Sequence, residues 1–150
     1  MSQTATYHTT VEWKGEHLGQ IRMGNGPEME FSAPPDARGL PGVLTPEDAF
    51  VAAVNSCIMM MFIWACERLK INLISYACRA EGTKLIELDK TEIFTDVRLR
   101  PVIRIAAGDE KVSAVERRVQ RALESAQKYS LVANSVKSKI IIESQIEVIE

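Results

Sequence analysis

The chain has 150 residues, of which 46% are hydrophobic and 25% charged, as in one ordinary globular domain that buries a core. A formal net charge of −2 leaves no basic surface for nucleic acid, so we expect no DNA or RNA partner. We predict a single domain over residues 1–150. Its three cysteines form no ligand-like cluster, and the first ten residues lack the pattern of a signal peptide, which favours the cytoplasm.

Short extended segments fill the first part of the chain. Residues 7–13, 18–23 and 27–32 are typical of three strands in an antiparallel meander. The stretch from Ser32 to Leu44, "SAPPDARGLPGVL", contains three prolines and two glycines. This composition predicts a loop.

The stretch "TPEDAFVAAVNSC", Thr45 to Cys57, predicts the start of a long helix. Thr45 suits the N-cap, Pro46 suits the first helical position, and Asp48 stands where the acid of a capping box belongs. We expect the helix to continue to about Lys70.

Residues 49–66 of this helix carry no charge, over a length near the lower limit for a membrane span. Against a span, Asn55 and Ser56 lie in the middle of the segment, and no other segment could join it in a bundle. We therefore predict a helix that is apolar all round because it is buried on every side. A chain of this length has difficulty in covering such a helix alone, so a second subunit would complete the burial.

The second half of the chain predicts strands around one more helix. Residues 72–82 form one extended segment, residues 85–105 hold two more, and residues 139–150 close the chain as a strand. The second helix begins at Asp109 and Glu110, with apolar residues at helical spacing: Val112, Val115, Val119, Ala122, Leu123 and Ala126. This order indicates an α+β fold with antiparallel sheets around a long central helix.

Cys57 is the first candidate for chemistry, although most free cysteines are small inert core residues. Its neighbours on the helix face are apolar, so a thiolate there requires a nearby cation or hydrogen-bond donor. Cys66 lies nine residues further, on the opposite side of the helix and about 13 Å along it, too far for a disulfide. Cys78 lies in a predicted strand, where packing is the simpler interpretation.

The stretch "TPEDAFVAAVNSC" resembles the Asn/Thr-Pro-Glu … Ala-Ala … Cys signature of the OsmC/Ohr family of hydroperoxide-reducing proteins. The order of the predicted elements resembles that family over nearly the whole chain. The resemblance implies an OsmC-like α+β fold, an intertwined homodimer, and a thiol-dependent peroxidase of oxidative-stress defence that reduces organic hydroperoxides. It implies that Cys57 is the peroxidatic thiol and that Glu47 orients an activating arginine. No spacing in the sequence suggests a metal site, and we expect no cofactor.

Glu47 and Cys57 are ten residues apart, about 15 Å along a continuous helix. If both serve one reaction centre, Glu47 must come from the partner chain, which supports a dimer with two sites at its interface. An acid in the first turn is also favoured by the helix dipole alone, so a purely structural role for Glu47 stays open.

The family's resolving cysteine, near the end of the second helix, corresponds to Ser130 in "YSLVANSVK". A serine cannot form the disulfide, yet the sulfenic acid left by peroxide attack must be reduced by a second thiol. An external thiol could do so, Cys66 or Cys78 could if the fold brings one close, or peroxidase activity has been lost.

The activating arginine is Arg38 or Arg22, of which we favour Arg38 because it lies in the loop before the central helix. The turn of the first hairpin, "KGEHLG", has no arginine and holds Lys14 and His17 instead. Either arginine would stabilise the thiolate and bind the displaced peroxide oxygen.

Three hypotheses follow. In the first, Cys57 attacks a hydroperoxide whose organic tail lies in an apolar pocket lined by Phe50, Met60, Met61 and Trp64, and an external thiol completes the cycle. In the second, an OsmC-like dimer binds a small apolar ligand without catalysis. In the third, Cys57 only packs, and no pocket exists beside it.

Overall fold

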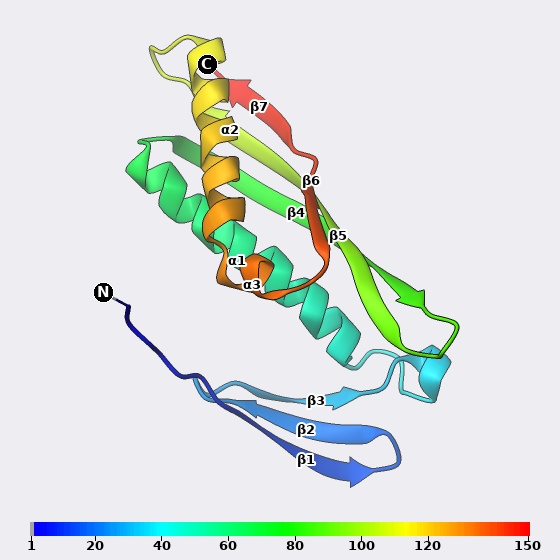
Figure 1. Cartoon of the computed structure of the whole chain (residues 1–150). Helices are drawn as coiled ribbons and strands as arrows, with labels where there is room; N and C mark the ends of the chain where they lie inside the picture. The colour runs from blue at the N-terminus through cyan, green and yellow to red at the C-terminus, as the bar shows by residue number, and fades with distance from the viewer. Residues whose placement is uncertain (1) are drawn as a thin grey trace. The chain divides into compact units, whose positions relative to one another are not determined.

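The computed structural model describes residues 2–150 (Figure 1). These residues form two compact units, an N-terminal unit that reaches to Phe50 and a C-terminal unit from Val51 to Glu150. The long helix α1 (Pro46–Arg68) begins in the first unit and continues in the second. A single domain over the whole chain stays a prediction.

The N-terminal unit is a three-stranded antiparallel sheet. Strands β1 (Thr9–Gly15), β2 (Leu18–Met23) and β3 (Glu28–Ser32) pair in chain order, which confirms the predicted meander. The proline-rich loop behind it holds one short helical turn, η1 (Pro35–Ala37).

The C-terminal unit is built on one long hairpin. Strands β4 (Asn72–Ile86) and β5 (Glu92–Ala106) pair antiparallel along their whole length. The sequence predicted three separate extended segments here. The structure joins the first of them to the beginning of the second, because the turn of the hairpin lies only at residues 87–91.

After β5 the chain passes through two helices, α2 (Val112–Tyr129) and α3 (Leu131–Ser135), before it returns to the sheet. It then forms β6 (Lys139–Ile142) and β7 (Gln145–Ile149), which both pair with β5 in parallel. A connection through a helix brings the chain back to its starting end, and parallel pairing follows. The predicted final strand is therefore two strands.

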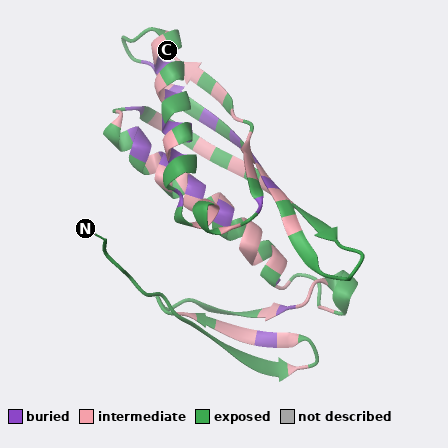
Figure 2. Cartoon of the chain, viewed as in Figure 1, coloured by how far each residue is buried: buried purple, intermediate pink, exposed green. Residues whose placement is uncertain are grey.

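Strand β5 lies at the centre of this sheet, and its residues alternate between two environments (Figure 2). Between the buried residues, Arg98 and Arg104 point to the other face, where they pair with Glu143 at 2.9 Å and Glu147 at 3.4 Å. One face thus contributes to the core and the other is charged. The buried residues of β5 are Val97, Leu99, Pro101, Ile103 and Ile105.

Helices α1 and α2 pack over the buried side of the sheet (Figure 1). The ring of Phe62 in α1 lies 5.4 Å from that of Tyr76 in β4, and Arg68 Nη2 donates to Ser125 Oγ in α2 at 3.0 Å. Helix α2 begins at Val112, three residues after the predicted start. Its predicted apolar face is confirmed by the buried residues Val115, Val119, Ala122, Leu123 and Ala126.

Helix α1 begins as predicted. Thr45 Oγ1 accepts a hydrogen bond from the Asp48 backbone N–H at 3.0 Å, which caps the helix. By length and composition α1 could cross a membrane, and within this chain only 28% of its most apolar 18 residues are buried. Met60 and Trp64 are 41% and 53% exposed. One chain therefore does not bury the helix on every side, and covering by a second copy stays a prediction.

Candidate functional site

Cys57 lies at the edge of the buried face of α1. Val54 and Ile58 on one side of it are fully buried, whereas Met60 on the other side is exposed, and the thiol itself is half-buried. At 3.1 Å from its sulfur lies Ser130 Oγ, which donates a hydrogen bond to Cys57 Sγ. The structure thus brings together the two residues that the resemblance placed at the peroxidatic and resolving positions.

Ser130 owes its position to the junction of two helices. It follows the last residue of α2 and is the N-cap of α3, where its Oγ accepts a hydrogen bond from the Ala133 N–H at 3.2 Å. The residue is completely buried. The sequence predicts Ser130 only as the position where the resolving cysteine is absent. The structure shows in addition that this capping serine brings a hydroxyl donor to the thiol of Cys57.

The other two cysteines lie on, or next to, other sides of α1. Asn55 Nδ2 donates to the carbonyl of Cys78 at 3.2 Å, and Asn55 lies about 200° around the helix from Cys57. Cys66 is buried about 180° from Cys57 on the same helix. Burial raises the pKa of the Cys66 thiol to about 11, with a smaller contribution from the charge of Glu67, and burial also raises the pKa of Cys78. A raised pKa keeps both thiols protonated near neutral pH, which disfavours either of them as the resolving thiol.

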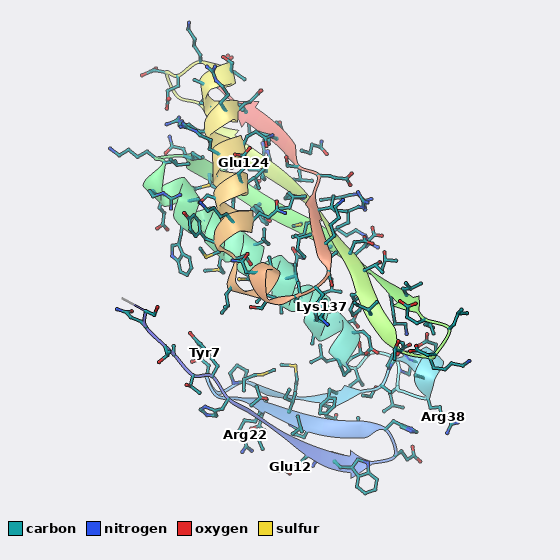
Figure 3. All side chains as sticks on the ribbon, viewed as in Figure 1. Tyr7, Glu12, Arg22, Arg38, Glu124 and Lys137 are labelled. Atoms are coloured by element: carbon teal, nitrogen blue, oxygen red, sulfur yellow. The ribbon has the colours of Figure 1, made fainter. Side chains whose placement is uncertain are left out.

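Three predicted cation candidates meet in the N-terminal unit. Lys14 and His17 of the β1–β2 turn and Arg38 of the following loop line one hollow of about 330 Å³. Figure 3 shows Arg38 in this loop. Its backbone is left-handed, with φ of 70°, and a side chain at the next residue, Gly39, would overlap the carbonyl oxygen of Ala33. The tight loop therefore fixes the position of the Arg38 backbone.

Arg22, the alternative arginine, lies on β2 and is already engaged (Figure 3). Its Nε donates to Glu28 Oε2 at 3.0 Å on the exposed surface of the sheet. This hydrogen bond, together with the charge of Glu28, raises the pKa of Arg22. Of the two arginines, Arg38 is the better candidate for an activating role.

Glu47 lies in the first turn of α1, where the helix dipole favours an acid. Its Oε1 is buried and has no hydrogen-bond partner among residues 2–150. A buried carboxylate oxygen without a partner is costly, so this position calls for a donor from elsewhere. The helix is continuous from Pro46 to Arg68. Glu47 and Cys57 of one chain are therefore too far apart to share a reaction centre, as the prediction of a two-chain site requires.

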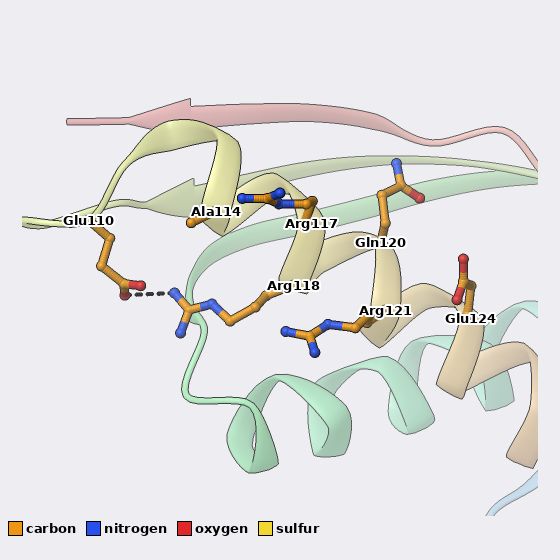
Figure 4. Close-up of a pocket in the computed structure, with 7 residues that line it drawn as sticks. All are labelled: Glu110, Ala114, Arg117, Arg118, Gln120, Arg121 and Glu124. Atoms are coloured by element: carbon orange, nitrogen blue, oxygen red, sulfur yellow. Dashed lines mark hydrogen bonds and ion pairs between the residues drawn. The ribbon is translucent and has the colours of Figure 1, made fainter.

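The predicted pocket residues lie along one stripe of α1. Met60 and Trp64 are exposed, and Phe50 and Met61 are half-buried. A separate hollow of about 600 Å³ in the C-terminal unit is lined by residues of α2 and by Glu110, which precedes it (Figure 4). There Arg118 pairs with Glu110 at 2.6 Å and donates to the Leu69 carbonyl at 3.3 Å, which ties α2 to the end of α1. Within residues 2–150 no three His, Cys, Asp or Glu side chains group as metal ligands do.

Comparison with known proteins gives a consistent picture. The sequence profile of the family described as OsmC-like protein matches residues 39–145. The fold is similar to an OsmC-like protein of unknown function from Vibrio cholerae, with TM-score 0.84 and 21% identity over 94% of this chain and 99% of the other. It is also similar to an organic hydroperoxide resistance protein from Elizabethkingia anophelis, with TM-score 0.73 and 18% identity over 99% and 100%.

A third similar structure is the organic hydroperoxide resistance protein OhrB of Bacillus subtilis, with TM-score 0.61 and 14% identity over 95% of this chain and 98% of the other. No curated protein matches the sequence significantly. The α+β fold with antiparallel sheets and a long helix is confirmed, and the apolar α1 is the long helix of this fold.

Proposed function

Because the chain belongs to the OsmC-like protein family, we propose that it is a thiol-dependent peroxidase that reduces organic hydroperoxides. The observation that carries the proposal is the half-buried thiol of Cys57 on the long helix, in contact with Ser130 at 3.1 Å. The organic hydroperoxide resistance proteins of the same fold support a peroxidase-like role in general.

In the proposed reaction the thiolate of Cys57 attacks the outer oxygen of the hydroperoxide ROOH. The O–O bond breaks, a new S–O bond forms, and the products are the sulfenic acid of Cys57 and an alkoxide that takes up a proton to become ROH. The sulfur is oxidised by two electrons and the peroxide is reduced by the same two.

An external thiol then reduces the sulfenic acid of Cys57 back to the thiol. A first thiol R′SH displaces water from the sulfenic acid and forms a mixed disulfide, and a second R′SH releases Cys57 and leaves as R′SSR′. The positions of Cys66 and Cys78 on other sides of α1 favour this external reductant over an internal one.

A homodimer would complete the site. A second copy would cover the exposed apolar stripe around Met60 and Trp64, and this shared surface would hold the organic tail of the substrate together with Phe50 and Met61. Arg38 would supply the cation that stabilises the thiolate and the leaving oxygen. Glu47 of the partner subunit would orient it, which would give the unpartnered Glu47 Oε1 its donor.

Stopped-flow oxidation of the reduced protein by cumene hydroperoxide tests the proposal. We expect rapid, stoichiometric formation of a sulfenic acid that a trapping reagent labels at Cys57. Cys57→Ser should abolish it, and the matched variant Cys78→Ser should leave it unchanged. Oxidation no faster than that of a free thiol, with cumene hydroperoxide or cumyl alcohol bound unreacted, would instead identify a non-catalytic apolar binder.

A further inference from the structure

We infer that Ser130 is a catalytic residue of the proposed peroxidase: its hydroxyl stabilises the reactive thiolate of Cys57, and its oxygen makes the oxidation stop at the sulfenic acid. The inference rests on the proposed function for its substrate. The contact between Ser130 Oγ and Cys57 Sγ at 3.1 Å is independent of that function.

The hydroxyl of Ser130 is oriented by its own hydrogen bonds. Its oxygen already accepts the Ala133 N–H at 3.2 Å, so a lone pair is occupied and the remaining proton is directed at the sulfur. Ser130 is fully buried, and in such surroundings a hydrogen bond to a charged group is stronger than in water.

This donor meets a requirement predicted from the sequence, that a thiolate at Cys57 needs a nearby cation or hydrogen-bond donor. Val54, Ile58 and Met61 flank Cys57 on the buried side of α1, and their apolar side chains cannot replace the water lost by a thiolate. The Ser130 hydroxyl supplies one such hydrogen bond from within the C-terminal unit. Arg38 would add a charge to a thiolate that already has a donor.

Serine also sets the product of oxidation. A cysteine at position 130 would attack the sulfenic acid, release water and close a disulfide with Cys57. The oxygen of Ser130 cannot form the sulfur–sulfur bond, so Cys57 must wait as a sulfenic acid for an outside thiol. The enzyme therefore depends on its external reductant in every cycle.

The first test is alkylation of Cys57 by iodoacetamide, followed by mass spectrometry of the peptide, which needs no peroxide. The Ser130 hydroxyl stabilises the thiolate that iodoacetamide alkylates, so Ser130→Ala should react about threefold more slowly at neutral pH. The matched control is Ser135→Ala in the same short helix, where Oγ donates to the Leu131 carbonyl at 2.7 Å. It should react at the wild-type rate.

A merely structural role of Ser130 predicts the opposite change. Loss of the α3 cap would loosen the junction and expose the sulfur, so alkylation would become faster at every pH. Loss of the donor slows alkylation at neutral pH, and at high pH, where the thiol is ionised with or without it, Ser130→Ala should react at least as fast as wild type. Unchanged or faster alkylation at neutral pH would overturn the inference about the donor.

The second test is Ser130→Cys treated with one equivalent of cumene hydroperoxide without external thiol. We expect the variant to lose two hydrogen atoms through a disulfide between positions 57 and 130, whereas wild type gains one oxygen atom at Cys57. If Ser130→Cys also stops at the sulfenic acid, the contact does not determine the product and this part of the inference is wrong.

The two proposals fail separately. If cumene hydroperoxide leaves wild type unoxidised while Ser130→Ala slows alkylation, the peroxidase proposal fails and the donor role stands. If wild type is oxidised at Cys57 but alkylation does not depend on Ser130, the peroxidase stands and Ser130 is only the cap of α3.

Discussion

Helices α1 and α2 lie over the same sheet, yet they relate to it differently. The apolar residues of α2 form one stripe and are buried within the chain, with charged residues opposite. Helix α1 is apolar on all sides, and the same chain buries only part of it. The difference shows that one chain is sufficient to bury the apolar residues of α2 but not those of α1. Cys57, whose thiol we propose to be reactive, lies at the boundary between the buried and the exposed side of α1.

The largest effect is expected from the buried side of α1. Phe62 is fully buried against Tyr76, so Phe62→Ala should lower the free energy of unfolding by about 3–5 kcal/mol. Val119→Ala on α2 removes two methyl groups and should cost about 2 kcal/mol. Denaturant unfolding measures both. The exposed control Glu124→Ala should stay within about 0.5 kcal/mol, and a Phe62 variant as stable as this control would contradict the assignment of the core.

The next effect separates the exposed sides of the two helices. Trp64→Glu places a charge on the apolar side of α1 and should weaken self-association by about 2 kcal/mol or more, roughly thirtyfold in Kd. Arg121→Glu on the exposed side of α2 should not change it. Analytical ultracentrifugation over a concentration series measures this. A wild-type chain that is monomeric throughout would remove the proposed dimer.

Sequence could predict much of this contrast because helical spacing determines which side of a helix is apolar. The spacing from Val115 to Ala126 placed the buried stripe of α2, and Thr45 with Pro46 placed the start of α1. Spacing could not divide α1 into covered and uncovered sides, since every side of it is apolar. That division depends on which side of α1 the sheet and α2 cover in the folded chain.

The pairing of strands that lie far apart in the sequence could also not be predicted from local patterns. The parallel arrangement of β6 and β7 beside β5 follows from the path of the chain through α2. In the hairpin turn between β4 and β5, Lys90 has a φ of 76°, a conformation that glycine usually adopts. Because the turn contains no glycine, the sequence did not indicate where it lies. At the site, the resemblance supplied Cys57 and Ser130, but only the folded chain shows the hydroxyl donating to the sulfur.

A smaller effect is expected from pH on the buried side of α1. Burial raises the pKa of Cys66 from 9.0 to about 11, so the unfolded chain loses this proton first. The folded state then binds more protons between these values, and stability falls as pH rises from about 9 to 11, by about 2 kcal/mol. Cys66→Ala should flatten the pH dependence of unfolding in this window. Equal slopes for wild type and variant would show that the folded thiol ionises as in the unfolded chain.

The smallest effect compares the two helix starts. Thr45 caps α1 through the Asp48 N–H, whereas Lys111 at the start of α2 makes no side-chain cap. Thr45→Ala should cost about 1 kcal/mol, and Thr45→Ser should restore most of it because the hydroxyl returns. Lys111→Asp should instead stabilise the chain by up to about 1 kcal/mol, since it adds a cap and a negative charge at the positive end of the helix. If Thr45→Ala and Lys111→Asp both leave thermal unfolding unchanged, packing alone stabilises the two helix starts. The contrast between the helices then lies entirely in which of their apolar sides the chain buries.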